Sequence, residues 1–159
     1  MTGQIHPVAY HTFRHKFNYE NNPKSTAYIP SNKGKYYFAG GLIGGQTQAF
    51  LNLCHALKNN IDNDFENDII ARWHDESHIN CYFSKIEPKK LHPGYCYPQD
   101  WYLPFEQKTW LLDKNKLGGH AFLRGQEIQH KFQFLKSKLF YFKLVVRAIL
   151  YKLFGKSIL

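Results

Sequence analysis

The chain has 159 residues, of which 43% are hydrophobic and 17% aromatic, and it carries a formal net charge of +9 at pH 7. This length suits a single domain, and the apolar fraction excludes a disordered chain because it is large enough to build a core. Cys54, Cys81 and Cys96 have no CxxC spacing and no secretory signal before them, which argues against a disulfide framework and favours a reducing, cytoplasmic compartment.

Two short strands are expected early in the chain, at 27–30 (AYIP) and 35–41 (KYYFAGG), because Tyr and Phe are framed there by Pro and Gly. The glycine pairs of the GGLIGG segment (40–45) have neither the GxGxxG spacing of a dinucleotide site nor the GK[ST] ending of a P-loop. They predict a turn, or a backbone that a ligand or a neighbouring strand approaches closely.

A helix is expected to follow, with Thr47 as its N-cap and the NNIDND segment (59–64) as its end. A second, short helix is expected to begin at Asp75, whose side chain would cap the first turn. Since a helix N-terminus favours negative charge, Asp75 and Glu76 are expected to stay ionised at neutral pH, as a nucleophile or a cation-stabilising carboxylate requires. The apolar residues of the first helix recur at helical spacing and are Phe50, Leu53, Cys54, Leu57 and Ile61.

The stretch WHDESHIN (73–80), which contains these carboxylates, has three interpretations. His74 and His78 are four residues apart, as zinc ligands on a helix are, but HDESH has Asp where the HExxH zinc hydrolases need Glu. The second interpretation is a capped surface helix with Trp73 buried, and the third is a pair of catalytic carboxylates. The residues alone leave the last two open.

The positive charge is concentrated at residues 127–159, which contain six Lys and one Arg against one Glu. The absence of Pro predicts a helix there, but its cations fall on two sides and do not leave a clean amphipathic stripe. Its uncharged runs are too short for a transmembrane helix. We expect this tail to lie on an anionic membrane surface, with packing on the domain or a partner chain as the alternative. Nucleic acid is not an expected partner because no reading module accompanies the tail.

Four segments, HPVAY (6–10), NYENNPKSTAYIP (18–30), KYYFAGGLIGG (35–45) and RWHDESHINCY (72–82), together resemble glycosyltransferase family 6 in order and spacing. That family contains the histo-blood-group A and B transferases, the α-1,3-galactosyltransferase and bacterial relatives. The resemblance implies an α/β fold, namely the C-terminal part of a GT-A fold with a mixed sheet and flanking helices, followed by a basic C-terminal helix. The expected domains are therefore 1–126 and 127–159.

The resemblance also implies a hexosyltransferase that retains configuration and moves GalNAc or galactose from UDP-GalNAc or UDP-Gal to O3 of a galactoside. The acceptor would be a lipid-linked or lipopolysaccharide glycan, and the enzyme would be cytoplasmic and peripheral at the membrane, the inner membrane if the chain is bacterial. Glu76 matches the carboxylate beneath the anomeric carbon, and Asp75 would hold hydroxyls of the donor sugar. Trp73 would offer a flat face to the acceptor galactose, and His6 would bind an acceptor hydroxyl.

The same resemblance assigns further positions. The AGG triplet (39–41) falls on the donor-selecting residues, where small side chains resemble the GalNAc enzymes. Asp100 matches an acceptor-contacting Asp, although CYPQDW is longer than the vertebrate pattern. Lys114 and Arg124 match cations that close over the diphosphate, with Lys116 as a rival to Arg124. The donor-binding residues implied by the resemblance are Asp75, Ala39, Gly40, Gly41, Lys114 and Arg124.

The resemblance begins about half-way through the family's domain. We therefore expect the uridine-binding half to be missing and the chain to be inactive alone, with no cofactor of its own. The need for Mn²⁺ stays open, since the segment that carries the metal motif is not in the sequence. The alternative function is a noncatalytic remnant that binds galactosides or a membrane surface.

Overall fold

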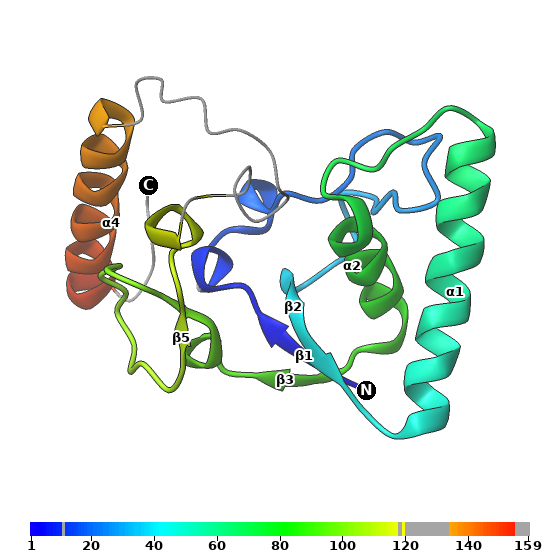
Figure 1. Cartoon of the computed structure of the whole chain (residues 1–159), viewed down its shortest axis with the longest axis horizontal. Helices are drawn as coiled ribbons and strands as arrows, with labels where there is room; N and C mark the ends of the chain where they lie inside the picture. The colour runs from blue at the N-terminus through cyan, green and yellow to red at the C-terminus, as the bar shows by residue number, and fades with distance from the viewer. Residues whose placement is uncertain (11, 118, 120–133, 155–159) are drawn as a thin grey trace. The chain divides into compact units, whose positions relative to one another are not determined.

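The structure is a computed structural model of the chain, and it describes residues 1–10, 12–117, 119 and 134–154 (Figure 1). The chain divides into two compact units, Met1–Pro93 and Gly94–Leu159. The domain boundary expected between residues 126 and 127 lies outside the described residues.

The first unit is built on a three-stranded mixed sheet in the order β2-β1-β3. Strand β1 (Thr2–Ile5) runs antiparallel to β2 (Phe38–Gly44) and parallel to β3 (Lys89–Leu91). The register of β1 on β2 shifts between Gly3 and Gln4. Glycine is needed at position 3 because an added Cβ would lie 2.6 Å from the ring of Phe83. The expected mixed sheet is thus confirmed.

Two helices follow β2, namely α1 (Thr47–Glu66) and α2 (His74–Ile86), and α2 packs against both β2 and α1 (Figure 1). Burial of aromatic and branched side chains between these elements supplies most of the driving force for their packing. Two apolar clusters make up this core, one of Phe38, Ile79 and Phe83 and the other of Tyr19, Ile29, Tyr37 and Cys81.

Side chains of α2 form hydrogen bonds with the backbone groups on the edge of β2 that faces away from β1. The amide of Asn80 accepts a hydrogen bond from Phe38 N through Oδ1 at 2.8 Å and donates to Phe38 O through Nδ2 at 2.9 Å. Both Asn80 and Phe38 are buried, so an unpaired backbone group there would cost about 1–3 kcal/mol. The Asn80 amide therefore takes the place of a fourth strand at this point of the sheet.

Four sequence expectations about elements and their boundaries are wrong, and two of them concern the strand at 27–30 and the end of α1. Residues 27–30 form no strand, and the region contains only an isolated bridge between Glu20 and Tyr28. Helix α1 does not end within 59–64 but continues to Glu66, and Asp64 near its end accepts hydrogen bonds from Ser25 and Thr26.

The helix starts also differ from the expectation. Thr47 is the first residue of α1 and Gln46 is the N-cap, without a side-chain cap. Helix α2 begins at His74 rather than Asp75, and its N-cap, Trp73, likewise has no side-chain cap. Instead, Trp73 N donates to Oγ of Ser77 at 3.0 Å. Asp75 therefore lies within the first turn and does not cap it.

The second unit contains the parallel pair β4 (Tyr97–Pro98) and β5 (Trp110–Leu111) and the helix α4 (Phe134–Phe154). Four 3-10 turns complete the described elements of the chain: Pro7–Ala9, Arg14–Lys16, Pro93–Cys96 and Lys114–Leu117. The helix expected within 127–159 is confirmed by α4. No helix in the described part of the chain is both long and apolar enough to cross a bilayer.

A buried polar cluster joins α1, α2 and the segment before β2. Ser25 Oγ donates to Asp64 Oδ2 at 2.5 Å, and His78 Nε2 lies 3.8 Å from the same oxygen. His78 Nδ1 is buried without a hydrogen-bond partner among the described residues. Burial lowers the pKa of His78, and the carboxylates of Asp64, Glu20 and Asp75 offset only part of this effect. Burial raises the pKa of Asp64, but the hydrogen bonds from Ser25 and Thr26 together lower it by more than burial raises it. The pKa of Asp64 is therefore lower than usual.

These shifts predict that the fold loses stability in mild acid. The unfolded chain takes up a proton at its histidines as the pH falls through about 6.5, whereas folded His78 resists protonation, so protonation favours unfolding. Below pH 4 the lowered pKa of Asp64 adds a loss of the same sign. We expect the urea midpoint to fall between about pH 7.5 and pH 5, and to fall less in His78→Phe. A midpoint that stays constant or rises over this interval would contradict the assignment.

Candidate functional site

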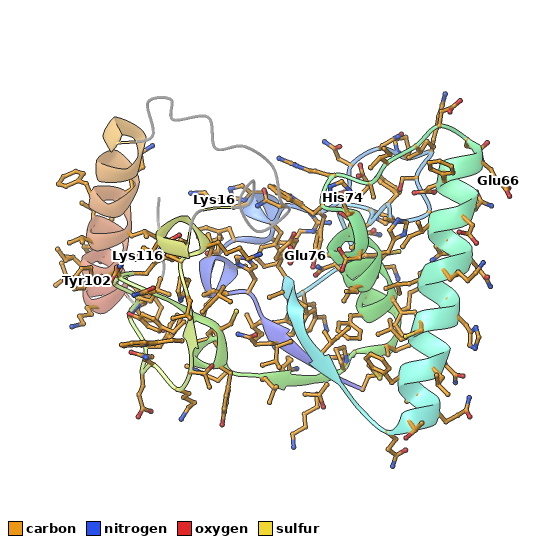
Figure 2. The ribbon with its side chains drawn as sticks, in the orientation of Figure 1. Lys16, Glu66, His74, Glu76, Tyr102 and Lys116 are labelled. Atoms are coloured by element: carbon orange, nitrogen blue, oxygen red, sulfur yellow. The ribbon has the colours of Figure 1, made fainter. Side chains whose placement is uncertain are left out.

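The candidate site is centred on Glu76, in the first turn of α2. Its Oε1 accepts a hydrogen bond from the Tyr37 hydroxyl at 2.7 Å, and its Oε2 accepts one from Gly40 N at 2.8 Å. Figure 2 shows Glu76 on the side of α2 that faces β2. Each carboxylate oxygen can accept two hydrogen bonds, so one position on each oxygen is not used by these contacts. The carboxylate is therefore fixed in orientation and still has acceptor capacity.

Tyr37 is held as a neutral donor to this carboxylate. Burial raises its pKa well above the usual range, and the hydrogen bond to Glu76 and the charge of Glu76 raise it further. Tyr37 O also accepts a hydrogen bond from His6 N at 2.8 Å, and the His6 ring lies edge-on to the phenol with centroids 5.6 Å apart. The Glu76–Tyr37 contact is consequently anchored in the turn that follows β1.

His6, a proposed acceptor-binding residue, is the N-cap of the 3-10 turn Pro7–Ala9. Its Nδ1 accepts a hydrogen bond from Val8 N at 3.2 Å, which sets the plane of the ring and makes Nε2 the nitrogen that carries the proton when the ring is neutral. The structure thus brings His6 to Tyr37, which in turn contacts Glu76. The role of His6 toward an acceptor stays a prediction.

Trp73 and Asp75, three residues and one residue before Glu76, are both exposed. The Trp73 side chain is 47% exposed, so the interpretation of Trp73 as a core residue is wrong. His74, between them, has a φ of 47°. A non-glycine residue in this left-handed region is strained, and such residues cluster at functional sites. The entry to α2 therefore presents an indole and a carboxylate to solvent beside the fixed Glu76.

The AGG triplet differs in surroundings from one residue to the next. Ala39 is buried, with 5% of its surface exposed. A Cβ on Gly40 would lie 3.3 Å from Glu76 Cβ, a close contact, so glycine lets the strand and the first turn of α2 approach each other. A Cβ on Gly41 would meet nothing within 4 Å. Of the three residues, Gly41 is the one beside open space.

The other proposed site residues belong to the second unit. Asp100 has a φ of 62° and forms an ion pair with Lys116, while Lys114 is exposed in a 3-10 turn. Arg124 lies outside the described residues. Asp100 also lines a cleft of about 360 Å³ whose aromatic walls were not singled out from the sequence. These aromatic residues are Tyr97, Trp101, Tyr102 and Trp110.

No group of three or more His, Cys, Asp or Glu side chains that could hold a metal ion occurs among the residues that the structure describes. None of the three cysteines forms a disulfide. Sequence reasoning missed Tyr37 and Asn80 as supports of the site. Asn80 had an indirect signal, because Glu76 and Asn80 are four residues apart and so share one face of α2. Tyr37 had none.

Comparison with known proteins agrees with the motif assignment. Residues 1–116 match the sequence model of glycosyltransferase family 6. The chain is 43% identical over 98 residues to histo-blood group ABO system transferase 1 of Rattus norvegicus, covering 61% of this chain and 28% of the rat protein. It is 37% identical over 94 residues to globoside alpha-1,3-N-acetylgalactosaminyltransferase 1 of Gallus gallus, covering 57% of this chain and 26% of that protein. The chain thus spans less than a third of the length of these two relatives.

The geometry predicts that the Gly40 amide depends on Glu76 for protection from hydrogen exchange. In Glu76→Ala the amide loses its acceptor, and its exchange measured by NMR should accelerate at least about tenfold. Asp75→Ala is the matched control, because it removes a neighbouring carboxylate that is exposed, and should leave the rate unchanged. The Phe38 amide, bonded to Asn80, should stay slow in both variants. Equal Gly40 rates in wild type and Glu76→Ala would show that the contact is not made in solution.

Proposed function

The chain belongs to glycosyltransferase family 6, and we propose that it forms the part of a retaining hexosyltransferase that holds the transferred sugar and its acceptor. The donor is UDP-GalNAc or UDP-Gal, and the acceptor is the O3 hydroxyl of a galactoside. The proposal rests on one observation above all, the Glu76 carboxylate held through both oxygens by Tyr37 and Gly40.

Retention of configuration requires a group on the face of the sugar opposite to the departing UDP, or a leaving phosphate that guides the acceptor to the same face. In the proposed reaction the bond from the anomeric carbon to UDP breaks, and UDP leaves with the electron pair. Glu76 either bonds to that carbon or stabilises its positive charge. The acceptor oxygen then forms the new bond to the anomeric carbon, which breaks the bond to Glu76 where one has formed, and the acceptor proton passes to a phosphate oxygen of the departing UDP. A carboxylate held in one orientation suits both roles, because it needs no reorganisation as charge develops.

Two exposed residues beside Glu76 support contacts with sugars. The half-exposed indole of Trp73 offers an apolar face of the kind on which galactose rings stack. Asp75, one residue before Glu76, is exposed, so its carboxylate is accessible to sugar hydroxyls as a hydrogen-bond acceptor. We assign the acceptor to Trp73 and His6 and the donor hydroxyls to Asp75.

The name of the rat relative refers to the ABO blood-group system and that of the chicken relative to N-acetylgalactosamine transfer in α-1,3 linkage. We infer the same class of reaction for this chain, and we favour GalNAc because Gly41 lies beside open space. The chain spans only 28% of the rat protein. We therefore assign turnover to the full-length protein that the gene encodes, whatever its length. For residues 1–159 alone we expect galactoside binding without turnover.

Glu76→Gln tests the catalytic assignment without disturbing the fold. A glutamine amide can place its oxygen toward Gly40 N and its NH₂ toward the Tyr37 hydroxyl, so both contacts survive while the negative charge is lost. We expect UDP release in the presence of lactose to fall about a thousandfold in the gene-encoded protein, with unchanged thermal unfolding. Glu66→Gln, which neutralises an exposed carboxylate on α1 (Figure 2), should leave the rate unchanged.

Two outcomes would contradict this proposal. Equal rates in wild type and Glu76→Gln would end the catalytic role of Glu76. The absence of transfer by the wild-type gene product, together with lactose binding seen by ligand-observed NMR, would instead identify a noncatalytic galactoside-binding protein.

The donor preference is tested at Gly41. Gly41→Leu fills the open space beside β2, and we expect it to lower kcat/KM for UDP-GalNAc relative to UDP-Gal by about tenfold or more, since the acetamido group needs that volume. Gly44→Leu is the matched control, because it lies on the same strand and also beside open space but outside the triplet. If the ratio of kcat/KM for the two donors is unchanged in Gly41→Leu, the acetamido group does not bind beside Gly41.

A further inference from the structure

Helix α4 has a continuous apolar face exposed to solvent over its last three turns. Phe142, Val145, Ile149 and Leu153 are 66%, 36%, 52% and 68% exposed. At about 100° per residue these four positions fall within about 80° of arc, so they line one side of the helix. We call these four residues the α4 face. The sequence expectation concerned residues 127–159 as a whole, whose cations fall on two sides, whereas the α4 face is confined to these last turns.

The opposite side of the same turns is buried in part, although Phe154, which also projects to that side by helical spacing, is 65% exposed. Leu144, on that side, is only 5% exposed, and Ala148 and Tyr151 are partly buried. The helix therefore uses one side for packing within the fold, which leaves the α4 face available for another contact. Four large apolar side chains exposed in a row are unusual for a surface with no partner.

Charge identifies the kind of partner. The 21 residues of α4 include five cations, Lys136, Lys138, Lys143, Arg147 and Lys152, and no Asp or Glu. Lys143 and Lys152 are exposed and fall on either side of the α4 face by helical spacing. Long lysine side chains in these positions can place their ammonium groups at the phosphates of a membrane while apolar residues between them enter the acyl region.

We propose that the α4 face is a membrane-binding surface that lies in the interface of a bilayer rich in anionic lipid. Self-association through the same face is disfavoured, because two copies would bring ten cations together without a counter-charge on α4. An anionic bilayer supplies both an apolar layer for the four side chains and negative charge for the lysines. The proposal stands on α4 alone and does not depend on the glycosyltransferase assignment.

Vesicle co-sedimentation of the full chain tests this surface. Wild type should bind mixed phosphatidylcholine and phosphatidylglycerol vesicles at least about tenfold more tightly than pure phosphatidylcholine, and the binding should weaken as salt is added. Ile149→Glu with Leu153→Glu should lower binding to the mixed vesicles at least about tenfold, since both carboxylates would enter the apolar layer and oppose the lipid charge. Lys143→Gln with Lys152→Gln should reduce the preference for anionic lipid.

The matched control is Phe65→Glu with Ile70→Glu in the first unit, where the two side chains are 74% and 71% exposed. This pair makes the same change in net charge and removes similar apolar surface, and it should bind vesicles as wild type does. Circular dichroism checks that each variant keeps its helices. Equal loss in both pairs would overturn the proposal, because charge alone would then explain it. A wild type that forms dimers in solution, becomes monomeric in Ile149→Glu with Leu153→Glu and ignores vesicles would assign the face to a second copy of the chain instead.

Discussion

The packing of the first unit depends on the hydrogen bonds made by the backbone groups on the outer edge of β2. Phe38 and Gly40 point their backbone polar groups away from β1, and no further strand in the described residues pairs with them. Asn80 and Glu76, one turn apart on α2, supply the missing hydrogen bonds. A side-chain amide and a carboxylate thus replace a neighbouring strand, and they fix both the distance and the rotation of α2 relative to the sheet. The orientation of Glu76 is a consequence of this arrangement.

This arrangement makes one carboxylate serve structure and chemistry together. Because Oε1 and Oε2 are each bound by a donor from the sheet side, the Glu76 side chain cannot rotate without giving up two hydrogen bonds. Glycine at position 40 allows the close approach that these bonds need. A rigid charged group next to an exposed indole at Trp73 is the kind of preorganised site that stabilises a cationic transition state. The membrane-binding surface proposed for α4 would add a means of bringing this chemistry to lipid-linked acceptors.

The sequence located β2, α1 and α2 of the first unit, but not the contacts that hold Glu76. Periodicity located α1, and α2 was expected from a cap at Asp75 that the structure does not form. The helix ends depend on tertiary contacts, such as that of Asp64 with Ser25, which no local pattern encodes. The aromatic and Pro signals at 27–30 predicted a strand, but the partner strand that would pair with it is absent from the described fold. Tyr37 could not be identified as the donor to Glu76 from the sequence, since the contact depends on the register between β2 and α2.

The central claim is that Glu76 faces the carbon at which the sugar is transferred. The most direct measurement is a crystal structure of the gene-encoded protein carrying Glu76→Gln, with intact UDP-GalNAc bound. The account predicts that the side chain at position 76 keeps its contacts with Tyr37 and Gly40 and lies within about 3.5 Å of the anomeric carbon. A donor sugar bound elsewhere, or a side chain turned away from that carbon, would contradict it.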